Sequence, residues 1–189
     1  MKKGILAILI ICAAVIAGSV LMLTGVIKLT PSGSVSEESA PGAVVKVPFM
    51  SVYFGIDASG YVTGTVSEGS DIPLVSGISF THIEEGAPAG TNDNDALVYA
   101  LNVVSLLKTN GITGIEEIAS DGEGSLTLIT GNIKIELGKS KDTAAKLEDL
   151  SHFYSQVAGM SGTLDMTSVS QNNQGYTFKK SSGEIVRGD

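Results

Sequence analysis

A run of about 24 uncharged, mostly apolar residues near the N-terminus constrains this chain most. The run covers residues 4–27, follows Lys2 and Lys3, and precedes about 160 residues of mixed sequence. A helix of about 20 residues crosses the hydrocarbon core of a bilayer, so the run is long enough to span one. The pattern predicts a single-pass membrane protein with almost all of its mass on one side.

The charges beside the run predict its orientation. Lys2 and Lys3 precede it, Lys28 follows it, and the sequence beyond becomes acidic. Short flanks rich in lysine and arginine stay in the cytoplasm. We therefore predict a cytoplasmic start and membrane helix over residues 1–29 of a cell-membrane protein with an extracytoplasmic domain. A cleaved signal peptide is the alternative, with residues 15–17 as the cleavage site, but the apolar run continues well past that point.

The remaining charge excludes one class of partner. Outside the three N-terminal lysines, the chain has nine basic and twenty acidic residues. Binding to nucleic-acid phosphates requires clustered lysine and arginine, so we expect no nucleic-acid partner. The same charge should repel an anionic membrane surface.

Composition divides the rest of the chain into three parts. Residues 30–43 are rich in Pro, Gly, Ser and Glu and predict a flexible linker. Residues 44–180 form one expected domain, large enough for a core, which the lack of Trp makes mainly aliphatic. Residues 181–189 are expected to be a disordered tail.

The spacing of apolar residues predicts an α+β domain. Strands are expected at residues 44–56, 61–66, 115–118, 126–130, 133–137, 163–166 and 176–179, with a short apolar segment at 72–78 and a loop at 79–90. Helices are expected at residues 96–107, with Thr91, Asn92 or Asp93 as the cap, and at 141–158. This order favours a mixed or antiparallel sheet with two helices packed on one face.

No group of side chains matches a catalytic or metal-binding pattern. His82 and His152 stand far apart, in an expected loop and an expected helix. Ser105 and Lys108 fit the S-x-x-K string of penicillin-recognising enzymes, but the partner motifs are missing. Residues 93–95 resemble the start of a calcium loop, but the glycine and closing glutamate are missing, which favours a helix cap.

Adjacent carboxylates give no better candidate. Glu116 and Glu117 fall on an expected strand, where neighbouring side chains face opposite ways, so we predict that they cannot act together. We expect a protein that is not an enzyme and has no cofactor, no metal and no small-molecule substrate. A hydrolase of unknown type is the least favoured alternative.

Four segments occur in an order that is typical of one family. Asp57 and Gly60 mark a hairpin turn, Pro73 and Gly77 lie in the 72–78 segment, Gly138 ends a strand before the second helix, and Asp165 lies in a late strand. With the membrane helix in front, this arrangement resembles the FtsQ/DivIB family of bacterial cell-division proteins. The resemblance covers residues 44–180, which would correspond to the family's β-domain.

One departure from the family concerns the region next to the membrane. Family members carry a POTRA domain of about 70 residues between the membrane helix and the β-domain. Here residues 28–43 alone separate the two, so a POTRA domain cannot fit. Roles that belong to POTRA are therefore not expected for this chain.

The resemblance implies a scaffold that is not an enzyme. Its partners would be FtsL-like and FtsB/DivIC-like membrane proteins at the division septum, and its role would be to help control septal wall synthesis. The docking edge would be the last strand, with Gly175, Tyr176, Thr177, Phe178 and Lys179. A strand without a later neighbour has unpaired backbone groups to which a partner strand can add.

Two features of that segment remain open to more than one interpretation. Lys179, Lys180 and Arg187 form a basic cluster, which would either meet an acidic partner or protect the edge from aggregation. Tyr176 and Phe178 face the same side, where they would either contact a partner or pack on the second helix. A membrane-anchored binding or adhesion module with no role in division is the alternative function.

Overall fold

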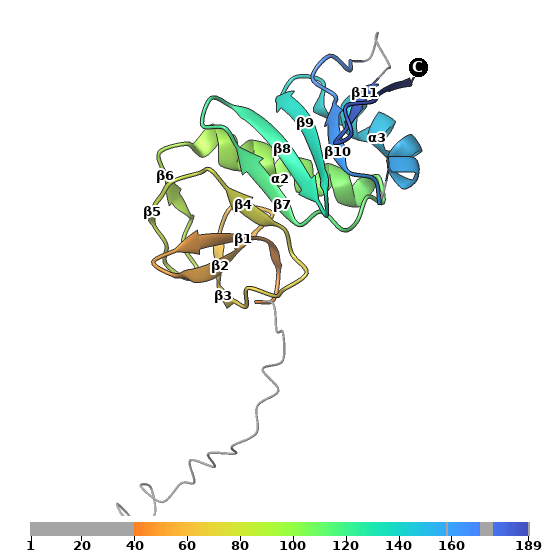
Figure 1. The fold of residues 1–189 in the computed structure, drawn as a ribbon. Coiled ribbons are helices and arrows are strands. Elements are labelled where there is room, and N and C mark those ends of the chain that lie inside the picture. The colour runs from red at the N-terminus through yellow and green to blue at the C-terminus, as the bar shows by residue number, and fades with distance from the viewer. Residues whose placement is uncertain (1–39, 158, 171–175, 189) are drawn as a thin grey trace, which may run out of the picture. The chain divides into compact units, whose positions relative to one another are not determined.

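One ten-stranded mixed sheet organises the domain (Figure 1). The computed structural model describes residues 40–157, 159–170 and 176–188. The strands run in the order β12 (Ile185–Gly188), β11 (Tyr176–Lys180), β10 (Gly162–Asp165), β9 (Ile133–Lys139), β8 (Ser125–Thr130), β7 (Glu117–Ser120), β4 (Leu74–Ser76), β1 (Ala43–Phe49), β2 (Val52–Asp57) and β3 (Val62–Val66). The neighbours β9–β10, β4–β7 and β1–β4 are parallel, and the other neighbours are antiparallel.

Two helices cover one face of this sheet, which confirms the predicted α+β class. They are α2 (Asn94–Thr109) and α3 (Thr143–Val157), and both lie behind the sheet in Figure 1. The core forms between these layers because strand residues alternate. In β9, Ile133, Ile135 and Leu137 are buried, whereas Lys134 and Glu136 are exposed. The polar side chains of β9 therefore lie on the second face of the sheet.

One of the three predicted caps of the first helix is correct, although the helix begins at Asn94, two residues before the expected start. Asp93 caps α2 and accepts a hydrogen bond from the Ala96 backbone N–H at 3.2 Å. The predicted membrane span at residues 4–27 lies outside the described residues. Within the described part of the chain, none of the helices is both long and apolar enough to cross a bilayer.

The prediction of one strand over residues 44–56 was wrong. The segment forms β1 and β2, joined by a tight turn in which Met50 and Ser51 both have positive φ, at 48° and 69°. The sequence has no glycine or asparagine here, so it lacks the usual signal for such a turn. The next predicted hairpin is correct: the Asp57 carboxylate accepts hydrogen bonds from two backbone N–H groups of the β2–β3 turn.

Three further predictions need correction. The 79–90 loop contains β5 (Phe80–His82), which pairs with β6 (Gly90–Thr91) in a separate two-stranded sheet. Strand β7 begins two residues later than expected, at Glu117. Residues expected in a disordered tail form β12, because Gly183 allows a turn at φ 92° and Ile185 and Val186 continue as a strand.

The short strand β4 connects the two halves of the sheet. It is parallel to β1 on one side and to β7 on the other. Gly77 follows it at φ 75°, and a Cβ atom built there would lie 2.0 Å from the backbone oxygen of Ser120. Glycine is therefore required at this exit both by conformation and by space.

We predict that Gly77→Ala destabilises the domain strongly. The added methyl group would overlap the Ser120 carbonyl, and alanine also disfavours positive φ, so the expected loss is about 3 kcal/mol or more. Chemical denaturation would measure it. Gly111→Ala is the matched control: its φ is 68° but nothing lies within 4 Å of the new Cβ, so it should lose only about 1 kcal/mol. Equal losses for both variants would contradict this account.

Candidate interaction surface

The face of the sheet opposite the helices is open over much of its width. The strand registers align one row of side chains across eight strands: Lys46, Leu74, Glu117, Ile129, Lys134, Thr163, Lys179 and Ile185. Lys46 is buried, and the other members are exposed or half-buried. A second row next to it contains Thr127, Glu136, Asp165 and Thr177. These rows give the domain a broad surface of polar and medium-sized side chains.

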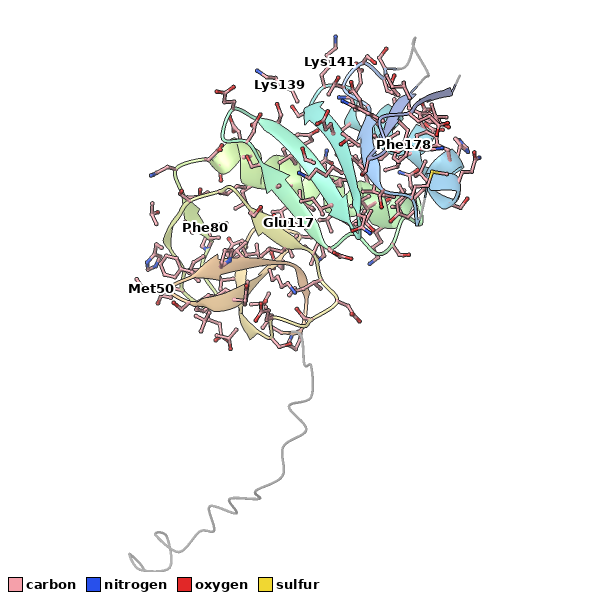
Figure 2. The ribbon with its side chains drawn as sticks, viewed as in Figure 1. Met50, Phe80, Glu117, Lys139, Lys141 and Phe178 are labelled. Carbon is pink, nitrogen blue, oxygen red and sulfur yellow. The ribbon has the colours of Figure 1, made fainter. Side chains whose placement is uncertain are left out.

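The predicted docking strand is not at the edge of the sheet. Strand β11 lies between β10 and β12, because the residues after Lys180 turn back and pair with it. Phe178, labelled in Figure 2, is 1% exposed and belongs to the core. Tyr176 stacks on Phe153 of α3, with ring centroids 3.9 Å apart. Packing on the second helix is therefore the correct interpretation of these two aromatic residues.

The other three predicted docking residues differ in position. Gly175 lies outside the described residues. Thr177 is half-buried on the open face, and Lys179 is exposed there beside Ile185 of β12. The predicted set is thus divided between the core and the open surface.

Among the strands that the structure describes, β12 is the edge at this end of the sheet. The backbone N–H of Lys180 donates to the carbonyl of Glu184 at 2.8 Å, so the N–H and C=O groups of the alternate residues Ile185 and Arg187 point away from β11. Ile185 and Val186 are also exposed, at 55% and 36%. Sequence reasoning missed these residues, although two β-branched residues after Ser-Ser-Gly-Glu are a recognisable strand signal.

The opposite edge of the sheet is partly covered. The Val62 N–H donates to the carbonyl of Ala87, and the Val62 carbonyl accepts from the N–H of Gly86. A bridge between Tyr61 and Pro88 extends this cover. Strand addition is therefore less favoured at β3 than at β12.

A polar cavity of about 250 Å³ lies on the open face between β1 and β7. It is lined by Lys46, Glu116 and Glu117, among others. The expectation that both glutamates lie on one strand was wrong, because Glu116 precedes β7. Their oxygens have separate partners, since Glu116 accepts from the Gly131 N–H and Glu117 accepts from the Ser76 hydroxyl.

Two buried lysines bind backbone carbonyls in place of carboxylates. The Lys46 ammonium donates to the carbonyls of Glu68 and Ser70. The Lys146 ammonium donates to the carbonyl of Leu137 at 2.6 Å. Burial lowers the pKa of Lys146 below its ordinary value of 10.5, and the nearby carboxylates Asp142 and Asp165 partly oppose this.

The remaining candidate residues, the two histidines, Ser105 and Lys108, do not form a common site. His82 pairs with Glu84 at 3.2 Å on the surface, and His152 is exposed on α3. Ser105 and Lys108 are exposed on α2. Among the described residues, no three His, Cys, Asp or Glu side chains are grouped so as to hold a metal ion.

The motif residues of the family resemblance lie at turns and strand ends. Gly60 has φ 86° in the Asp57 turn, and Pro73 offers its carbonyl to the Lys46 N–H at 2.9 Å. Gly138 has φ 67° near the end of β9. Asp165 accepts hydrogen bonds from the N–H and hydroxyl groups of Thr167. Each residue stabilises the local backbone.

Comparisons of the chain with protein-family models, with curated proteins and with solved structures found no match. The functional assignment therefore depends on the geometry of the domain and on the resemblance of its segments.

We predict that Phe178→Ala lowers the free energy of unfolding by about 3 kcal/mol or more, because a buried phenylalanine leaves a cavity. Lys179→Ala is the control: the next side chain on the same strand is exposed, so its loss should be within about 0.5 kcal/mol. Denaturant unfolding of both variants measures this. A stable Phe178→Ala variant would mean that this side chain is not part of the core.

A second prediction concerns pH. The folded pKa of Lys146 lies below its unfolded value, so the folded state binds this proton more weakly and wild-type stability rises as pH increases towards about 10.5. Lys146→Met lacks this titration. We expect the stability of the wild type relative to Lys146→Met to increase between pH 7 and pH 10.5, as measured by urea unfolding. A constant difference would contradict the lowered pKa.

Proposed function

We propose that this chain is a non-enzymatic, single-pass membrane scaffold that binds partner proteins at the outer edge of β12. The observation that carries the proposal is the free edge itself. Ile185 and Arg187 direct unpaired backbone groups outwards, and Ile185 and Val186 add exposed apolar surface. An extended partner segment can add to such an edge through main-chain hydrogen bonds, while side-chain contacts supply specificity.

The resemblance to FtsQ/DivIB proteins suggests which partners these are. Docking on the last strand is what the resemblance implies, and the last strand among the described residues is β12. The proposed edge therefore moves from residues 175–179 to Ile185–Gly188. On this proposal the partners are FtsL-like and FtsB/DivIC-like membrane proteins, the location is the division septum, and the role is to help control septal wall synthesis.

A second candidate is a membrane-anchored binding or adhesion module with no role in division. The short connection of residues 28–43 favours it, because the chain has no room for the POTRA domain of the family. The two candidates differ in location. A fluorescent fusion that gathers at midcell supports the division scaffold, and an even distribution over the cell membrane supports the second candidate.

We predict that Ile185→Pro removes partner binding without unfolding the domain. Proline lacks the outward N–H of residue 185 and its ring occupies the edge, while the hydrogen bonds between β11 and β12 avoid this residue. Pull-down of the full chain, in detergent, with the extracytoplasmic segment of the host's FtsB/DivIC-like protein measures the effect. The expected loss of affinity is at least about tenfold.

Ile185→Thr is the matched control, because it keeps the N–H and a β-branched side chain and should retain most of the binding. Thermal unfolding checks that both variants fold. If Ile185→Pro binds like the wild type, the docking edge is wrong. If the folded wild type does not bind this partner at all, the division scaffold is wrong and the second candidate gains support.

A further inference from the structure

A cavity of about 400 Å³ lies where β9 leads into α3. Three lysines line it, Lys139, Lys141 and Lys146, together with the hydroxyl-bearing residues Thr167 and Ser170. Figure 2 shows Lys139 and Lys141 at the same end of the sheet, extending away from the ribbon. The cavity therefore combines lysine side chains with the Ser170 hydroxyl, since the Thr167 hydroxyl already donates to the carboxylate of Asp165.

Lys146 gives this cavity a buried positive charge. The residue is 3% exposed, and its ammonium group donates to the carbonyls of Leu137 and Lys139 at 2.6 and 3.4 Å. An ammonium group has three N–H donors, so one remains for another acceptor. Among the described residues, no carboxylate lies within ion-pair distance of it, although Asp142 and Asp165 are near enough to act on its charge. An anion that enters the cavity would stabilise this buried charge further.

The distribution of charge along the chain supports an anionic ligand at this position. Residues 40–123 contain eleven acidic and two basic residues, whereas residues 124–188 contain six acidic and seven basic ones. Asp142 is the one acidic residue in the lining of the cavity. Three lysines of this acidic protein therefore line the same cavity.

A second lysine-lined cavity, of about 350 Å³, serves as a comparison. Lys134, Lys179 and Lys180 line it on the open face. The charge of Lys180 is already paired with Glu184 at 2.8 Å. All three lysines are exposed or half-buried, so none supplies a buried ammonium. This cavity is less suited to an anion than the one at Lys146.

We propose that the cavity of Lys139, Lys141 and Lys146 binds a phosphoryl group. Lys139 at the end of β9, Lys141 in the turn before α3 and Lys146 within α3 line one cavity together with Ser170. Several separate donors suit the oxygens of a phosphate better than a planar carboxylate, and lysine binds phosphate as a point charge. The phosphoryl group belongs either to a free phosphate or to a lipid headgroup. The site is separate from the β12 edge, so it does not depend on the proposed scaffold function.

Calorimetric titration of the full chain in an uncharged detergent tests the site, with inorganic phosphate in one arm and a soluble short-chain phosphatidylglycerol in the other. We expect Lys139→Gln/Lys141→Gln to weaken binding about tenfold, because each ion pair at a partly exposed site contributes modestly. Lys146→Met should also lose binding while the domain stays folded. The matched control is Lys134→Gln/Lys179→Gln, which removes two positive charges at the other cavity and should change affinity less than about twofold.

Each outcome bears on the proposal. Tighter binding of inorganic phosphate identifies free phosphate as the ligand, and tighter binding of the phosphatidylglycerol identifies a lipid headgroup; both support the site if the Lys139/Lys141 variant removes the binding. Absence of binding in both arms overturns the proposal. An equal loss in the control variant also overturns it, because the effect would then reflect overall charge alone.

Discussion

The parallel pairing of β4 with both β1 and β7 is the interaction on which the rest of the domain depends. In the described sheet, this three-residue strand joins the hairpins of β1, β2 and β3 to the strands that follow α2. Val75 at its centre is fully buried in the shared core. Gly77 lets the chain leave β4 close to the Ser120 backbone at the end of β7, and this close approach requires glycine.

The sequence predicted those elements whose information is local. The alternation of Ile133, Ile135 and Leu137 and the turn before them identify the β8–β9 hairpin, and the spacing of apolar residues identifies both helices. Prediction from the sequence failed where a turn lacks its usual glycine or asparagine, as at Met50 and Ser51. It failed again where long-range pairing decides the structure, since β11 becomes internal only because β12 pairs with it.

The candidate site was harder to predict for the same reason. Phe178 and Lys179 are neighbours in sequence, yet one is in the core and the other on the surface. Which of them could meet a partner depends on which face α3 covers, and on the stacking of Tyr176 with Phe153. The cavity at Lys146 likewise depends on β9, α3 and residues 167–170 coming together, and these are separated in sequence.

The two edges of the sheet differ in how far their backbone groups are covered. Backbone hydrogen bonds from residues 86 and 87 cover part of β3, while β12 keeps outward groups next to exposed Ile185 and Val186. An uncovered edge with apolar side chains promotes aggregation unless a partner strand pairs with it. Lys179 lies beside Ile185 on the open face, one strand in from this edge, so it is not directly opposite an added strand. The features that favour a partner at β12 are therefore its outward backbone groups and its two exposed apolar side chains.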